Sequence, residues 1–222
     1  MSADTAPEGV PDLRGSAERA PGERGRSNRE ALEEAAWEVF SETPYRHVRV
    51  AEIAARAGVS MGTFYSYFDS KEALFRVAAA RALEDMFDYP RQDPDNAERN
   101  PVQDLAFGMR QYFLACRRNR TIARSIEQVY MLDDEIRLNR RGTLMRGAKR
   151  LERWILGLQS QGICDAGIDP WLTALALQFM SVNLAYDQLV QREQPQDLDA
   201  LVAAVVPIWA KAVGMERWLQ RP

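Results

Sequence analysis

The segment Gly58-Val59-Ser60-Met61-Gly62 has the G-x-S-x-G spacing that presents a nucleophilic serine in α/β-hydrolases. That chemistry needs a strand before the serine and, later in the chain, a histidine that accepts the hydroxyl proton. Here a helical pattern of apolar residues precedes Ser60, and the only histidine, His47, lies upstream. We therefore expect no hydrolase, no other enzymatic activity and no catalytic residue.

The same segment fits the turn of a helix-turn-helix. An apolar stripe ends at Gly58, which suits a left-handed helix end, and Ser60 can cap the helix that follows. The second helix of such a pair fits the major groove of duplex DNA. Phe64 and Phe68 are expected to be buried, and Lys71 begins the next helix, where it could hold a phosphate. The DNA-contact candidates off the buried stripe are Ser60, Met61, Gly62, Thr63, Tyr65, Ser66 and Tyr67.

Charge and composition agree with a globular protein that has a local basic face. The chain has 222 residues, of which 46% are hydrophobic and 27% charged, and its net charge is −3. That net charge argues against indiscriminate coating of nucleic acid. From Thr43 to Lys71, however, four basic residues stand against two acidic ones. We expect the face that meets DNA to be locally positive.

Helical periodicity predicts an all-α fold. Residues 1–26 are rich in Pro and Gly, and we expect a disordered tail there. Ser27 to Glu30 has the form of a capping box, so a helix-turn-helix DNA-binding domain is expected over 27–75 and a larger helical-bundle domain over 76–222. Helices are predicted at about 27–40, before Gly58, from Ser60, at 70–89, from 101, and at 121–132, 133–161, 170–191 and 198–213.

Residues 50–75, VAEIAARAGVSMGTFYSYFDSKEALF, closely resemble the TetR family of bacterial transcriptional regulators. The resemblance covers about Ser27 to Phe75 and implies that Ser60, Gly62, Thr63, Tyr65 and Tyr67 contact DNA and that Lys71 binds phosphate. Members often carry Thr-Thr where this chain has Val48-Arg49, so Arg49 is expected to meet a phosphate instead. Members also commonly have His at the position of Tyr67.

The larger domain is rich in side chains that line pockets. The resemblance implies an effector pocket between its helices, and the expected ligand is a largely apolar small molecule. The pocket candidates are Phe107, Met109, Tyr112, Phe113, Tyr130, Trp154 and Phe179. From Arg117 to Arg153, 11 basic residues stand against 5 acidic ones. This segment is either an ordinary solvated face or a contact for an anionic effector.

The last two predicted helices are apolar on nearly every face, which is typical of a surface covered by a second copy. The expected homodimer interface consists of Leu172, Leu175, Phe179, Val182, Leu201, Val205, Ile208 and Trp209. A two-fold dimer would bind an inverted-repeat operator. The predicted function is a ligand-responsive repressor. The alternative is an architectural protein that binds DNA constitutively, although residues 76–222 exceed what dimerisation alone requires.

The sequence predicts no metal site, no cofactor, no membrane span and no signal peptide. Cys116 and Cys164 have no metal or redox spacing, and with one histidine we expect no metal site and no cofactor. No signal peptide or membrane span is predicted, so the expected location is the cytoplasm. Arg24, Arg26 and Arg29 are either solvated or an arm that contacts the minor groove.

Overall fold

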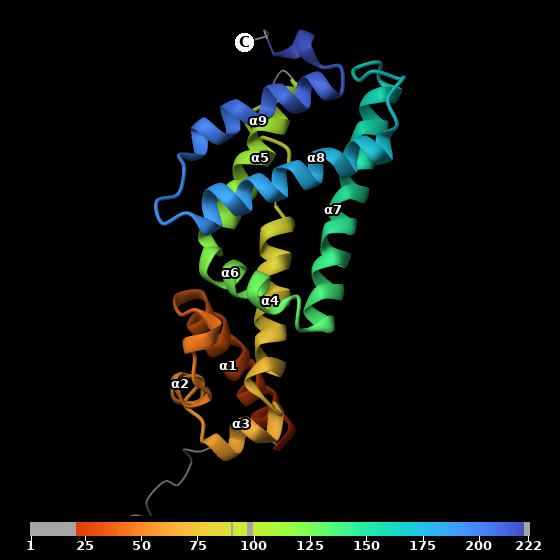
Figure 1. Cartoon of the computed structure of the whole chain (residues 1–222). Helices are drawn as coiled ribbons and strands as arrows, with labels where there is room; N and C mark the ends of the chain where they lie inside the picture. Colours follow the sequence, from red (N-terminus) through yellow and green to blue (C-terminus); the bar gives the residue numbers. More distant parts are fainter. Residues whose placement is uncertain (1–20, 90, 97–99, 220–222) are drawn as a thin grey trace, which may run out of the picture.

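The computed structural model describes residues 21–89, 91–96 and 100–219, and these form a helical molecule with no strand (Figure 1). An all-α fold is therefore confirmed. The α-helices are α1 (Pro21–Glu42), α2 (Val50–Arg56), α3 (Met61–Tyr67), α4 (Lys71–Phe87), α5 (Pro101–Arg118), α6 (Arg120–Val129), α7 (Asp134–Ser160), α8 (Pro170–Ala185) and α9 (Leu198–Ala212). Short 3-10 turns lie at Tyr45–His47 and Glu216–Trp218, and a π-helical turn, Tyr186–Gln191, follows α8.

Side-chain caps start several helices where the sequence predicts them. Asn100 accepts a hydrogen bond from the backbone N–H of Val102, and Asp169 accepts one from that of Leu172. Both residues precede a proline at the first helical position, where a missing N–H costs nothing. The long α7 ends at Ser160, close to the predicted end at 161, and Gly162 just beyond it has a left-handed φ of 67°.

The first helix begins earlier than predicted. α1 starts at Pro21 and not at the capping box at Ser27, so the expected tail is wrong for residues 21–26. Proline has the φ angle of a helix and needs no N–H partner in the first turn, so it also suits a helix start. Residues 1–20 of the predicted tail lie outside the described part of the chain.

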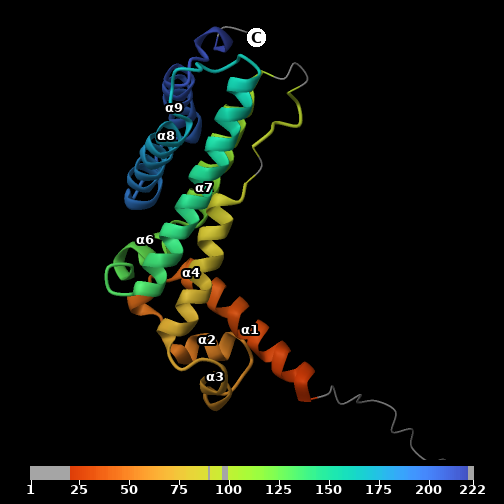
Figure 2. The same cartoon turned by 90° about the vertical axis from the view of Figure 1, so that its right-hand side faces the viewer.

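α4 connects the two halves of the molecule. α1 packs on α4, with α2 on α1 and α3 on α2. α5, α6 and α7 also contact α4, and α8 and α9 pack on α7 and α5 beyond its far end (Figures 1 and 2). Phe75 is fully buried near the start of α4, and Phe87 is buried at its end. A shift of α4 in the bundle would therefore be felt by α2 and α3. None of the described helices combines the length and apolar character needed to cross a bilayer.

Candidate nucleic-acid interface and effector cavities

The turn between α2 and α3 has the geometry that a helix-turn-helix requires. Gly58 adopts a left-handed φ of 68°, a conformation that costs a residue with a Cβ about 1 kcal/mol or more. Two residues later, the Ser60 Oγ accepts a hydrogen bond from the backbone N–H of Thr63 at 3.0 Å. The serine of the G-x-S-x-G segment is thus a helix cap at the start of α3.

α3 buries one face and exposes the other. Phe64 is fully buried and Phe68 nearly so, as predicted, while Tyr65 is 54% exposed. The Tyr65 ring meets the Phe64 ring edge to face at 5.1 Å, which holds the tyrosine upright on the surface. Met61 is also exposed. α3 lies at the end of the molecule opposite α9, so its outer face is open to a partner (Figures 1 and 2).

The smaller polar candidates are partly engaged within α3. The Thr63 Oγ1 lies 2.9 Å from the Ser60 Oγ, and the Ser66 hydroxyl donates to the carbonyl of Thr63 at 2.6 Å. Tyr67 is half-buried and packs against the core. Each hydroxyl oxygen can still accept a further bond, but Tyr65 offers the largest free side chain on this face.

The fold would tolerate a side chain at position 62, yet the residue there is glycine. A Cβ built on Gly62 would lie 3.7 Å from the Ser60 Oγ, which is an ordinary contact. Inside a helix, glycine costs about 1 kcal/mol relative to alanine. The small residue therefore has no packing explanation, and it permits close approach of another molecule to the α3 backbone.

Lys71 is engaged differently from what the sequence predicts. Its ammonium donates to the carbonyl oxygens of Tyr45 at 3.1 Å and Val48 at 3.3 Å, and lies 4.2 Å from the centre of the Tyr45 ring. Two of its three donors thus fasten the turn before α2 to the start of α4. A phosphate contact by the third donor stays a prediction.

Replacing Lys71 by alanine is therefore expected to destabilise the protein by about 1–3 kcal/mol, because two carbonyl oxygens lose a charged partner. The matched control is Arg49→Ala, since Arg49 is exposed and forms no ion pair among the described residues. Thermal unfolding measures both variants. An unchanged melting temperature for Lys71→Ala would contradict this structural role.

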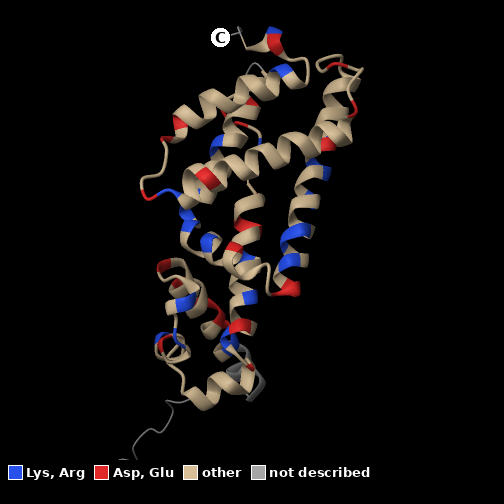
Figure 3. Ribbon diagram, viewed as in Figure 1, with Lys and Arg blue, Asp and Glu red and all other residues tan. Residues whose placement is uncertain are grey.

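Part of the predicted basic face is neutralised within the chain. Arg56 forms ion pairs with Glu42 at 2.9 Å and Glu38 at 3.7 Å, so it adds little free positive charge. Arg46 and Arg49 remain exposed near the start of α2. Figure 3 shows basic and acidic residues mixed along the helices of this half of the molecule. Any attraction to phosphate here rests on few side chains.

Described residues of the larger domain line a group of three small cavities. The inner cavity has a volume of about 50 Å³ and is lined by Met86, Tyr112, Ile126, Leu144, Val182 and Tyr186, among others. The middle cavity, of about 10 Å³, is lined by Tyr89, Met109, Tyr112, Ser181, Val182 and Trp209, among others. The outer cavity, of about 50 Å³, is lined by Tyr89, Arg91, Met109, Leu151, Trp154 and Trp209, among others.

The predicted pocket residues are only partly brought together. Tyr112 and Met109 each line two of these cavities and Trp154 lines one. The remaining four, Phe107, Phe113, Tyr130 and Phe179, line none of the three, so an effector contact by them stays a prediction. Phe113 is fully buried in the core, whereas Phe179 is 42% exposed on α8, because the two lie on other faces of their helices. Tyr89 lines two of the cavities but is not among the predicted pocket residues. It lies next to Pro90, where the helical pattern of apolar residues ends.

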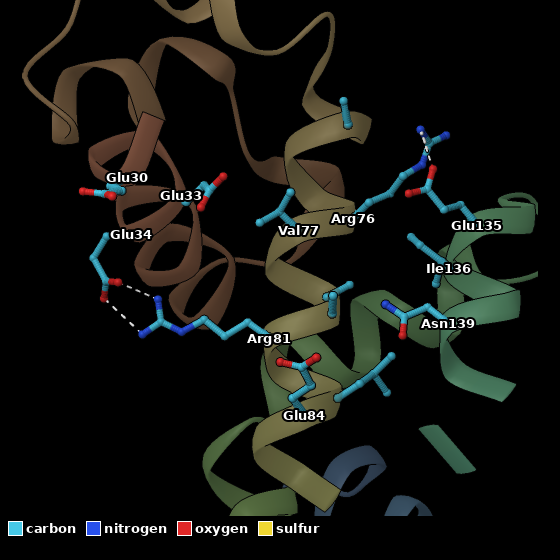
Figure 4. A pocket seen from close by; sticks show the side chains of 14 residues that line it. Glu30, Glu33, Glu34, Arg76, Val77, Arg81, Glu84, Glu135, Ile136 and Asn139 are labelled. Carbon is cyan, nitrogen blue, oxygen red and sulfur yellow. Dashed lines mark hydrogen bonds and ion pairs between the residues drawn. The ribbon is translucent and has the colours of Figure 1, made fainter. Parts of the chain in front are cut away.

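A surface groove of about 560 Å³ lies where α1, α4 and α7 meet (Figure 4). On one side Arg81 pairs with Glu34 of α1. On the other, Arg76 donates to the Asp133 carboxylate at 2.9 Å and lies 3.3 Å from the Glu135 carboxylate. These pairs tie α4 to both domains. Among the described residues, no cluster of acidic, His and Cys side chains could hold a metal ion.

Asp133 makes this junction sensitive to acid. Its Oδ1 accepts from the backbone N–H groups of Glu135 and Ile136, and its Oδ2 accepts from Arg76. Burial alone would raise the pKa of Asp133, but these bonds outweigh it and hold the pKa below the ordinary 3.8. Because the folded pKa is depressed, its stabilising effect is present above the ordinary pKa and is lost as pH falls through the folded value.

Replacing Asp133 by Asn is accordingly expected to cost about 1–2 kcal/mol at neutral pH, since the bond from Arg76 loses its charged acceptor. The cost should shrink toward zero in acid, where the wild-type carboxyl is itself protonated. Thermal unfolding of both proteins from pH 7 down to pH 2 measures the gap. A gap that stays constant over this range would contradict the assignment.

The outer faces of α8 and α9 carry exposed apolar side chains. Leu172, Phe179 and Ile208 are exposed, and Leu175 and Val182 are half-buried. Leu201, Val205 and Trp209 are instead buried within the chain, so their prediction as interface residues is wrong. α9 packs on α5, and the Trp209 indole donates to the Ser181 hydroxyl at 3.1 Å, which turns this face of α9 inward.

Comparison with known proteins identifies the helix-turn-helix. Residues 32–78 match the family model described as bacterial regulatory proteins, tetR family. The chain is 27% identical over 188 residues to the fatty acid metabolism regulator protein of Bacillus subtilis, covering 81% of this chain and 92% of the relative. It is 28% identical to the HTH-type transcriptional repressor KstR of Rhodococcus jostii, over 49% of this chain and 50% of the relative.

Solved structures share the fold of most of the chain. A putative transcriptional regulator from Saccharomonospora viridis, solved in complex with choline, superposes with a TM-score of 0.66 and 19% identity. The match covers 84% of this chain and 96% of that structure. Residues 32–78 are therefore similar to the DNA-binding part of the tetR family of bacterial regulatory proteins, and the relatives that match more of the chain are named as transcriptional regulators.

Proposed function

We propose that the protein is a repressor that acts in the cytoplasm, binds an inverted-repeat operator as a homodimer and is released by a small apolar effector. The observation that carries the DNA-binding part is α3, whose Phe64 side is buried while Tyr65, Met61 and Gly62 face outward. A helix with this outer face can enter the major groove of B-form DNA.

We propose that some of the predicted residues contact DNA directly and that the others hold α3 in position. Tyr65 and Met61 are the exposed side chains that can reach base edges, and Gly62 and Ser66 let the backbone approach. Arg49 is placed to meet a phosphate beside them. Ser60, Thr63, Tyr67 and Lys71 act mainly by holding α3 and the preceding turn in place, through the bonds and packing described above.

The proposed effector site is the row of cavities in the larger domain. Met86 and Phe87 of α4 line the inner cavity together with Ile126 of α6. A ligand that enlarges this cavity must displace α4, and α4 carries the helix-turn-helix on its first turns. An effector that favours the displaced state by roughly 3–5 kcal/mol would empty the operator.

The relatives support a ligand-responsive regulator over a constitutive architectural protein. One relative is named as a regulator of fatty acid metabolism and another as a repressor, and a structural neighbour was solved with a small molecule. Cavities that contact α4 also give an effector a physical route to the DNA-binding helices.

The test is an unbiased selection of duplexes by the full-length protein, repeated in the presence of a library of small apolar compounds. We expect the recovered duplexes to share an inverted repeat and at least one compound to release them. Recovery of duplexes without a shared repeat would refute operator binding. Unchanged retention with every compound would favour the architectural alternative.

A further inference from the structure

The three cavities form one elongated path through the larger domain. The inner and middle cavities share Tyr112 and Val182, and the middle and outer cavities share Tyr89, Met109 and Trp209. Side chains that line two cavities at once are the partitions between them. The three cavities are therefore adjacent along this path, and their linings are mostly apolar.

Two of these partitions, Tyr89 and Tyr112, are aromatic rings in contact, and the Phe87 ring of the inner cavity lies against Tyr112. The Tyr112 ring lies 5.6 Å from the Phe87 ring and 5.7 Å from the Tyr89 ring, centre to centre. Each of the two larger cavities has room for only one or two water-sized groups. A ligand longer than a few atoms must move these rings aside. A linear, narrow ligand would fit such a path with the least displacement.

An arginine stands at the outer end of the path. Arg91 lines the outer cavity, is half-exposed, and has its guanidinium 4.5 Å from the centre of the Tyr89 ring. Its backbone lies directly on α5, since a Cβ added at Gly108 would be 3.4 Å from the Arg91 Cα. Asp104 also lines this cavity, and its Oδ1 accepts from the backbone N–H of Asp93 at 2.9 Å.

A second arginine, Arg150, is close enough to Arg91 for their charges to interact. One N–H donor of Arg150 has no hydrogen-bond partner among the described residues. Arg150 donates from its Nη2 to the carbonyl of Phe87, and its Nη1 lies 3.7 Å from the carboxylate of the exposed Asp88. Its Nε is buried and has no hydrogen-bond partner among the described residues. Burial first, and then the positive charge of Arg91, lowers the pKa of Arg150. Arg150 thus adds positive charge close to Arg91, although it does not itself line the outer cavity.

We propose that the path binds a linear aliphatic chain whose anionic head group pairs with Arg91 at the outer end, with Arg150 adding positive charge beside it. This inference rests on the proposed effector function and specifies the chemical class of the effector. The aliphatic tail would replace the ring contacts at Tyr89 and Tyr112 and reach the α4 side of the inner cavity. The head group would be a carboxylate or a phosphate, which Arg can bind with two parallel hydrogen bonds.

The test compares three probes of equal chain length, decanoate, decyl phosphate and 1-decanol, below their aggregation limits. Binding to the full-length protein is followed by tryptophan fluorescence, because Trp154 and Trp209 line the path, and by calorimetry. The variants are Arg91→Gln, which removes the charge, and Arg91→Lys, which keeps it. Arg117→Gln is the matched control, since Arg117 is exposed on α5 and lines none of the three cavities.

In the wild type, at least one anionic probe should bind roughly tenfold more tightly than the alcohol, as expected for one charge-assisted contact. Whichever anion is preferred identifies the head group. The preference should vanish in Arg91→Gln and persist in Arg91→Lys and Arg117→Gln. Equal binding of all three probes, binding of none, or a preference that survives Arg91→Gln would overturn the inference. Release of operator by an uncharged compound in the duplex selection would leave the proposed function standing in each of those cases.

Discussion

Replacing Tyr65 by alanine is expected to weaken operator binding by about a hundredfold and to leave the melting temperature almost unchanged. The side chain is 54% exposed and forms no hydrogen bond within the described part of the chain, so the fold loses little. In the groove, its ring and hydroxyl contribute about 1–2 kcal/mol of binding free energy. Because a two-fold dimer presents the residue twice, the losses combine.

Titration of a labelled operator duplex with the purified variant measures this loss. Phe64→Ala is the contrasting variant at the neighbouring position. Phe64 is fully buried, and its truncation should cost about 3–5 kcal/mol of stability and lower the melting temperature. Tyr65→Phe separates the hydroxyl from the ring. Wild-type affinity of Tyr65→Ala for the operator would remove α3 from the proposed interface.

The helix starts and the helix-turn-helix could be predicted because their causes are local. Ser60, Ser70 and Asn100 each accept a hydrogen bond from a backbone N–H two or three residues later, so a short stretch of sequence contains both partners. Gly58 likewise needs only its own backbone angle to mark the turn. The spacing of Phe64 and Phe68 then fixes which face of α3 is left outside.

What could not be predicted depends on partners that are distant in sequence. The carbonyl oxygens that hold Lys71 lie 23 and 26 residues away, so the sequence suggested only its position at a helix start. Trp209 bonds to Ser181, 28 residues away, and this contact turns inward a face that periodicity alone leaves undecided. α9 is apolar on most faces, so its pattern does not indicate which face meets α5.

The cavities could not be predicted from the sequence for the same reason. Aromatic residues of the larger domain could be named as pocket candidates, but a pocket is a relation between helices. Tyr112 and Phe113 are neighbours on α5, yet Tyr112 lines two cavities while Phe113 is buried in the core. Arg91 lies between elements and has no periodic pattern around it. Its position over α5 follows from the course of the chain after α4.

Replacing Phe179 by glutamate is expected to convert the protein to a monomer. Phe179 lies with Leu172 and Ile208 on the exposed apolar faces of α8 and α9, which we propose to be covered by a second copy. Two-fold symmetry places the new carboxylate in the interface twice, and burial of an unpaired charge costs several kcal/mol. Sedimentation at micromolar concentration should then give the mass of one chain, 25.2 kDa.

Operator binding should fall with dimerisation, because a monomer presents a single α3 to one half of the inverted repeat. The loss should exceed the hundredfold of Tyr65→Ala, since a whole half-site is released. Leu138→Glu is the matched control, because Leu138 is 66% exposed but lies on α7, away from this surface. Both variants introduce the same charge in place of an exposed apolar side chain, so a difference in mass between them isolates the α8 and α9 faces. A dimeric Phe179→Glu, or a monomeric wild type, would place the contact between copies elsewhere on the molecule.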